Sequence, residues 1–116
     1  MRTMALVLSG GVTSERTATA LKLAERLLDR GQRVTVFAHD DTTVLSAGSG
    51  EVAEAVTALL RRGVHGGTLD WVVDRNAAQR LGVADRQVPG VVVGDHADLW
   101  SFVRSADVVL SAGGAP

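Results

Sequence analysis

Residues 4–15 read MALVLSGGVTSE, and this stretch decides the fold. Its first five residues form a short apolar run with the length and composition of a buried strand. The run passes through Ser9-Gly10-Gly11 into a helix-start signal at Thr13-Ser14-Glu15. A strand that leads into a helix in this way predicts the beginning of a parallel sheet. In such sheets the ligand crevice lies beyond the carboxyl ends of the strands.

The rest of the chain alternates the same two kinds of segment. Helical spacing of apolar residues predicts helices over 14–30, 51–62 and 75–81, and a fourth that Asp95 caps; apolar runs predict strands over 33–39, 69–73, 91–93 and 108–110. Gly31 and Gly82 follow helices and are predicted to end them, and 42–50 is predicted to be a loop. The sequence therefore predicts a flavodoxin-like three-layer α/β/α sandwich with a five-stranded, mostly parallel sheet, in one domain over 1–112 with a frayed tail at 113–116.

The composition narrows the function classes. The 116 residues carry a formal net charge of -1, which provides no electrostatic attraction to nucleic acid or anionic lipid, and we expect neither partner. The chain has no cysteine, which excludes disulfides, thiolate metal sites and any mechanism in which this chain carries sulfur on a thiol. No stretch has the length or character of a signal peptide or a membrane span, so a cytoplasmic protein is expected. Trp71 and Trp100 could line a pocket or an interface, but in a mostly aliphatic domain they are predicted first to fill the core.

Several motifs together resemble the DsrE/DsrF-like family of sulfur-relay proteins. They are the helix start Thr13-Ser14-Glu15-Arg16, the strand 31-GQRVTVF-37, and a closing pattern made of Gly82, 90-GVVVG-94, 97-ADL-99 and 106-ADVV-109. The order and spacing of these motifs, rather than any one of them, carry the resemblance, which covers nearly the whole chain. It implies a flavodoxin-like fold and an assembly into trimers or hexamers, sometimes from different but related subunits.

The chain departs from that family at one position. Sulfur-carrying members have a cysteine where the third strand meets the third helix, and the alignment of 72-VVDRNAA-78 puts Asp74 there. A carboxylate cannot form a persulfide. The resemblance therefore favours a member that lacks the active-site cysteine, and no catalytic role is carried over to this chain.

The loop Ser9-Gly10-Gly11-Val12-Thr13-Ser14 comes close to the S-G-G-x-D-S loop of ATP pyrophosphatases. Backbone N–H groups and hydroxyls at such a helix start suit a phosphate or another anion. Thr13 stands where that motif has an acidic residue, so we favour a tight turn with a Ser or Thr cap. A nucleotide or phosphate site at Ser9, Gly10, Gly11, Thr13 and Ser14 remains the alternative.

Carboxylates also fall near the predicted strand ends. Asp40, Asp74 and Asp95 could meet at one rim, where crowded carboxylates raise each other's pKa or hold a hard cation. Helix caps at Asp74 and Asp95 and a solvated turn at Asp40 are the favoured interpretation. Asp74 and Asp40 are therefore only candidate catalytic residues of an alternative small enzyme with acid/base or hydrolytic chemistry.

The remaining polar candidates have equally plain interpretations. Arg75 and Asn76 could hold an anionic group beside Asp74, although a solvated first helical turn or a capping bond from Asp74 to Asn76 explains them as well. His39, His65 and His96 are far apart and show no ligand spacing, so no metal and no cofactor are predicted, although His39 and His96 could both reach the crevice.

These observations favour a non-catalytic DsrE-like binding protein or subunit that cannot carry persulfide itself. We expect a homo-oligomer, or an assembly with related subunits, whose crevice binds a small ligand or a sulfur-relay protein. Asp74, Arg75 and Asn76 are candidate binding residues of this crevice.

Overall fold

The computed structural model describes residues 3–9, 14–48, 50–62 and 69–113. The strands are β1 (Thr3–Ser9), β2 (Arg33–Ala38), β3 (Leu69–Asp74), β4 (Val91–Gly94) and β5 (Val108–Gly113). The α-helices are α1 (Ser14–Asp29), α2 (Glu51–Arg62), α3 (Arg75–Arg80) and α4 (His96–Ser105), and two 3-10 helices are η1 (Asp40–Val44) and η2 (Ala84–Arg86).

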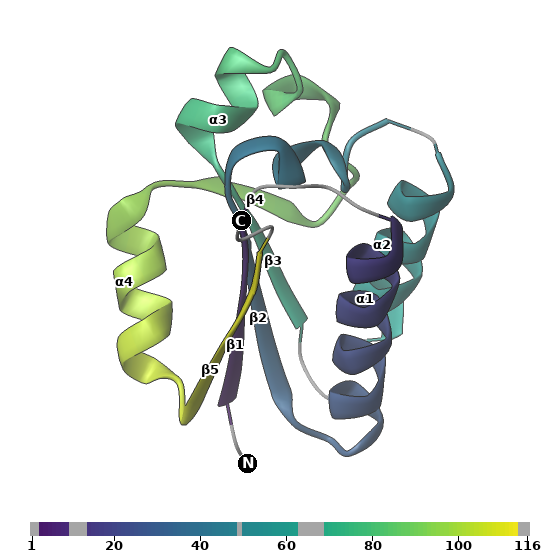
Figure 1. The fold of residues 1–116 in the computed structure, drawn as a ribbon, viewed down its shortest axis with the longest axis vertical. Helices are drawn as coiled ribbons and strands as arrows, with labels where there is room; N and C mark the ends of the chain where they lie inside the picture. The colour runs from purple at the N-terminus through teal and green to yellow at the C-terminus, as the bar shows by residue number, and fades with distance from the viewer. Residues whose placement is uncertain (1–2, 10–13, 49, 63–68, 114–116) are drawn as a thin grey trace.

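The five strands form one sheet in the order β4-β3-β2-β1-β5, and every neighbouring pair is parallel (Figure 1). The predicted flavodoxin-like α/β class is therefore confirmed, with a sheet that is parallel throughout. Strands β2 to β4 extend the sheet on one side of β1, whereas β5 pairs on its other side. The direction of winding thus reverses between β1 and β5, and the carboxyl ends of all five strands meet at one edge.

This winding places the helices. Right-handed crossovers put α1 and α2 on one face of the sheet, and the return from β4 to β5 puts α4 on the other (Figure 1). The larger core lies under α1 and α2, where it contains Leu27, Leu28, Val56 and Leu59 of the helices packed against alternate strand residues such as Val34, Val36 and Val73. None of the described helices combines the length and apolar character that a bilayer span requires.

The helix α1 ends as its sequence predicts. Gly31 adopts a φ of +73°, a left-handed conformation that glycine reaches at little cost, and its N–H donates to the Leu28 carbonyl at 2.9 Å. Gln32 N–H then donates to the Leu27 carbonyl, and the chain enters β2. Gly82 has the same φ of +73° after α3, which confirms its predicted role.

The segment after β2 differs from the predicted loop. Instead of a solvated connection, it forms η1 and buries three small polar residues, Thr42, Thr43 and Ser46. The Thr42 hydroxyl donates to the carbonyls of Leu8 and His39, and Gln87 Nε2 donates to the Thr43 carbonyl at 2.9 Å. Because these bonds satisfy the polar groups, a segment with a loop-like composition can pack beneath α3 and η2.

The two tryptophans have different environments. Trp71 is 2% exposed in the core, as predicted. Trp100 is 60% exposed on α4, so the prediction that it fills the core was wrong. The reason is that, in the part of the chain that the structure describes, α4 is the only helix on the smaller face of the sheet, so no second helix encloses its outer side.

Candidate functional site

The carboxyl edge of the sheet brings His39 and Asp74 together through strand register. Phe37 of β2 pairs with Val72 of β3, and His39 and Asp74 lie two residues further along their chains. Since side chains alternate along a strand, each of these two residues continues the face that Phe37 and Val72 occupy. That face is the one covered by α4. The strand pairing alone therefore places an imidazole beside a carboxylate just beyond the sheet.

The third side chain of the site, His96, is the first residue of α4. Asp95 caps this helix: its side chain accepts from the Asp98 N–H at 3.1 Å, while the Asp98 carboxylate accepts from the Asp95 N–H at 2.9 Å. This capping box fixes the point at which α4 begins. His96 is thereby held directly after the carboxyl end of β4, which pairs with β3.

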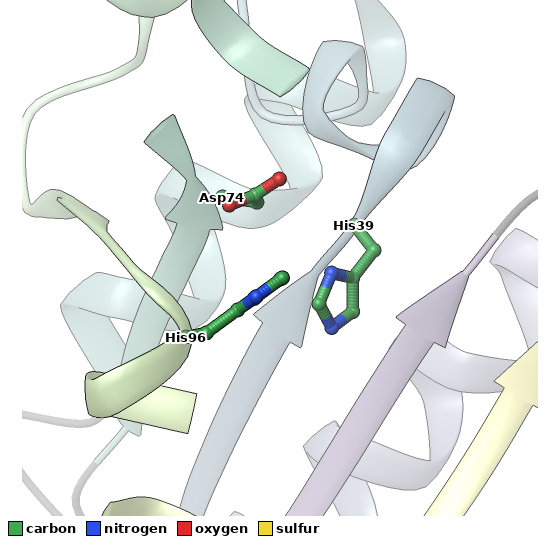
Figure 2. Close-up of side chains that lie close together, drawn as sticks. All are labelled: His39, Asp74 and His96. Carbon is green, nitrogen blue, oxygen red and sulfur yellow. The ribbon is translucent and has the colours of Figure 1, made fainter. Parts of the chain in front are cut away.

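The three side chains His39, Asp74 and His96 form what we call the edge cluster (Figure 2). One ligand-type atom from each, a ring nitrogen or a carboxylate oxygen, lies within 4.8 Å of the others. The two imidazole rings are 5.6 Å apart between centroids, and Phe37 lies 4.7 Å from His39 on the same measure. Asp74 is buried, His39 is half-buried and His96 is exposed, so the cluster is open to solvent on the α4 side.

Asp74 also has a structural role. Its Oδ2 atom accepts a hydrogen bond from the Ala77 N–H at 3.3 Å and so caps α3. The prediction that Asp74 is a helix cap is confirmed, with Ala77 rather than Asn76 as the donor. A cap bond of this kind orients the carboxylate at the end of β3 without using both of its oxygens.

The neighbouring predicted residues are more peripheral. Arg75 and Asn76 are exposed on the first turn of α3. The Arg75 guanidinium donates to the Val93 carbonyl at 3.4 Å and so extends toward β4. The pKa of the Asp95 carboxyl is lowered mainly because the Asp98 N–H stabilises the charged form; desolvation opposes this, and the charge of Arg75 adds to the lowering. Asp95 is therefore an ionised cap, and its side chain is engaged with Asp98.

Some predicted site residues lie outside what the structure describes. These are Gly10, Gly11 and Thr13 entirely, together with the side chains of Ser9, Ser14 and Asp40 and the whole of His65. The anion-binding alternative at residues 9–14 therefore stays a prediction. The backbone of β1 ends at Ser9 on the same edge of the sheet as Asp74, because β1, β2 and β3 are parallel.

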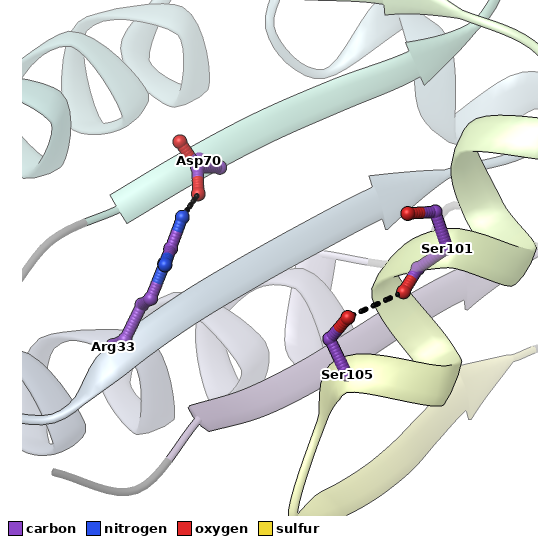
Figure 3. A network of polar contacts seen from close by, with 4 residues as sticks. All are labelled: Arg33, Asp70, Ser101 and Ser105. Atoms are coloured by element: carbon purple, nitrogen blue, oxygen red, sulfur yellow. Dashed lines mark hydrogen bonds and ion pairs between the residues drawn. The ribbon is translucent and has the colours of Figure 1, made fainter.

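The opposite end of the same sheet face carries a simple surface contact. Arg33 and Asp70 form an ion pair of 3.5 Å whose side chains are 53% and 40% exposed (Figure 3). Exposed pairs of this type add little stability. On α4 the Ser105 hydroxyl donates to the Ser101 carbonyl at 2.9 Å, a local bond within the helix. Neither contact brings together groups with chemistry comparable to that of the edge cluster.

The sequence predicts Asp74 as a candidate site residue and predicts that His39 and His96 can reach the crevice, but it does not predict that the three side chains meet. The signals were present: His39 and Asp74 each follow an apolar run, and His96 follows a predicted cap. The sequence does not show how close the three side chains lie in space. His39 and Asp74 are 35 residues apart along the chain, and Asp74 and His96 are 22 residues apart.

Fold and site together define a flavodoxin-like α/β protein with a histidine–carboxylate cluster at the carboxyl edge of its sheet. Among solved structures, that of the ychN protein from E. coli matches with a TM-score of 0.80 and 19% sequence identity, over 96% of this chain and 99% of that chain. This likeness shows the shared fold. Neither the models of known protein families nor the curated proteins include a match to the chain.

Proposed function

We propose that this chain is a non-catalytic DsrE-like binding protein, which assembles with copies of itself and holds a small ligand at the edge cluster. The observation that carries the proposal is the convergence of His39, Asp74 and His96 within 4.8 Å at the carboxyl edge of the sheet. Ligand sites of open parallel sheets lie at this edge. Because the chain contains no cysteine, the site offers nitrogen and oxygen donors but no sulfur, and this chain cannot carry a persulfide.

Self-association is supported by the face of the sheet that α4 covers. A fully parallel sheet normally has both faces covered by helices, whereas among the described residues this face carries only α4, a helix without buried residues. Val92 of β4 is 55% exposed, Val109 of β5 is 41% exposed, and Trp100 of α4 is 60% exposed. A second copy seated on this face would remove these side chains from water, which is favourable in proportion to the apolar area buried. With a net charge of only -1, two copies repel each other weakly.

The test is the mass of the full chain in solution. We expect light scattering and native mass spectrometry at micromolar concentration to report an oligomer, and we expect Trp100→Glu to reduce its mass toward that of a monomer while circular dichroism stays unchanged. Trp100 is exposed in the single chain, so a charge there affects association rather than folding.

A matched control is Ala58→Glu, which adds the same charge at an exposed position of α2, on the opposite side of the sheet. This variant should keep the mass of the parent protein. A parent protein that is strictly monomeric, or a Trp100→Glu variant that keeps the parent's mass, would refute assembly through the α4 face.

A further inference from the structure

We propose that the edge cluster is a binding site for a divalent transition-metal ion, with His39, Asp74 and His96 as its three protein ligands. This inference rests on the proposed function, because it names the ligand of the same site. It starts from the composition of the cluster: two imidazoles and one carboxylate are the donors that zinc and related ions take in proteins with open coordination positions.

The distances are close to those that a metal ion requires. In a tetrahedral zinc site the metal–ligand bonds measure about 2.0–2.2 Å, so two ligand atoms lie about 3.4 Å apart. The ligand-type atoms of the edge cluster lie within 4.8 Å of one another. The remaining gap is under about 1 Å for each side chain, which rotation of the half-buried and exposed imidazoles can close without backbone movement.

The donor types select the class of metal. Calcium and magnesium prefer oxygen ligands and in most sites take several carboxylates or carbonyls. The edge cluster provides two nitrogen donors and one carboxylate, a set that favours zinc, cobalt, nickel or ferrous iron instead. Three protein ligands leave at least one coordination position for water or a small anion, and His96 lies on the solvent side of the cluster, where such a molecule can enter.

The backbone holds each ligand in place before any ion binds. His39 donates its backbone N–H to the Leu8 carbonyl at 2.8 Å, which ties the end of β2 to β1. Asp74 is oriented by its cap bond to Ala77, and His96 by the capping box at the start of α4. Because the backbone at each ligand is already fixed, ion binding has to order only the side chains of His39 and His96, and this limits the entropy lost on binding.

The experiment uses the full-length, tag-free chain after treatment with a chelator and its removal. Calorimetric titration with zinc ions should give one ion per chain with micromolar or tighter affinity. Titration with cobalt ions should give the visible absorption of a four- or five-coordinate site. His96→Gln and Asp74→Asn should each weaken zinc binding by at least about tenfold and reduce the cobalt absorption.

These variants are chosen so that the fold survives. His96 is exposed, and in Asp74→Asn the amide oxygen of the new side chain can still accept the cap bond from Ala77. The control Asp70→Asn removes the same charge from the opposite end of β3 and should bind zinc as the parent does. Circular dichroism without metal checks that all variants are folded.

Two results would overturn the inference: no zinc binding by the parent chain, or binding that His96→Gln and Asp74→Asn leave unchanged, since the ion would then bind elsewhere. Light scattering on the chelator-treated protein measures assembly independently of zinc binding. The failure of the metal site can therefore be told apart from the failure of the proposed assembly. An oligomer without zinc affinity would contradict the metal site alone, whereas a zinc-binding monomer would contradict assembly alone.

Discussion

Asp74 belongs both to the edge cluster and to the cap of α3. In the alignment that the sequence motifs suggest, it takes the position of the cysteine of sulfur-carrying DsrE/DsrF-like proteins, and a carboxylate cannot form a persulfide. The same side chain caps α3, through the bond to Ala77. A substitution at position 74 therefore changes ligand binding alone only when the new side chain still accepts the hydrogen bond from Ala77.

The cap can be measured by itself. We expect Asp74→Ala to lower the free energy of unfolding by about 1 kcal/mol, because the Ala77 N–H loses its acceptor, whereas Asp74→Asn keeps most of the stability. Urea denaturation followed by circular dichroism gives both values. Asp70→Asn, with its partly exposed side chain, should change stability by less than about 0.5 kcal/mol. An Asp74→Ala variant as stable as the parent would show that the cap bond contributes nothing.

At the scale of elements, the junction of β4 and α4 positions the exposed part of the edge cluster. Gly94 ends β4, and Asp95 and His96 follow it directly. A Cβ atom at position 94 would lie 2.7 Å from Asp98 Oδ2 and 2.8 Å from Val72 Cγ1. Both distances are too short, and both neighbours are constrained, Asp98 by the capping box and Val72 by burial. Glycine is thus needed for the start of α4 to approach the sheet this closely.

Gly94→Ala should therefore displace the start of α4 and lower the free energy of unfolding by about 1–3 kcal/mol, as overpacking does elsewhere. The displacement should also move His96 away from His39, so zinc affinity should fall together with stability. Gly50→Ser is the control: a Cβ there meets nothing within 4 Å, and serine suits the position before α2. Chemical denaturation and calorimetry measure both effects, and a Gly94→Ala variant as stable as the parent would contradict the close approach.

The sequence predicts the regular elements well, since apolar periodicity and glycine punctuation are local signals. The helices predicted over 14–30 and 51–62 are observed as Ser14–Asp29 and Glu51–Arg62, and the strand predicted over 69–73 extends by one residue to Asp74. The segment 42–50 was predicted as a loop because small polar residues favour loops. In the fold, Thr42 and Thr43 are buried, and hydrogen bonds with residues distant in the sequence satisfy their polar groups. Such bonds cannot be predicted from a local sequence pattern.

The site was predictable only in part for a related reason. The position of Asp74 at a strand end followed from its apolar neighbours, and its cap role followed from its residue type. The meeting of His39 and His96 depends on strand order, on register and on the start of α4, which are properties of the assembled sheet. The exposure of Trp100 was not predictable for the same reason. Helical spacing of apolar residues shows that a helix forms, but it does not show whether other helices pack beside that helix and bury its side chains.

In the molecule as a whole, the two faces of the sheet are unequal. The face under α1 and α2 carries the main core, in which Val34, Val56 and Val73 are fully buried. On the other face α4 is the only helix within the described ranges, and none of its residues is buried. Regions with few buried apolar contacts open more easily than the core does. The fold is therefore expected to open first at α4, the element that provides His96.

Hydrogen exchange followed by mass spectrometry tests this order of opening. In dilute Trp100→Glu protein, we expect the amides of α4 to exchange at least about tenfold faster than those of β2 and β3, because local opening of α4 leaves the main core intact. In the parent protein, a second copy on the α4 face would slow the exchange of α4 as concentration rises and leave β2 unchanged. Excess zinc should slow it as well, since an ion bound to His96 and Asp74 holds α4 against the sheet. If the amides of α4 in the variant exchange as slowly as those of β2, then α4 unfolds together with the main core. That result would contradict the expectation that α4 opens first.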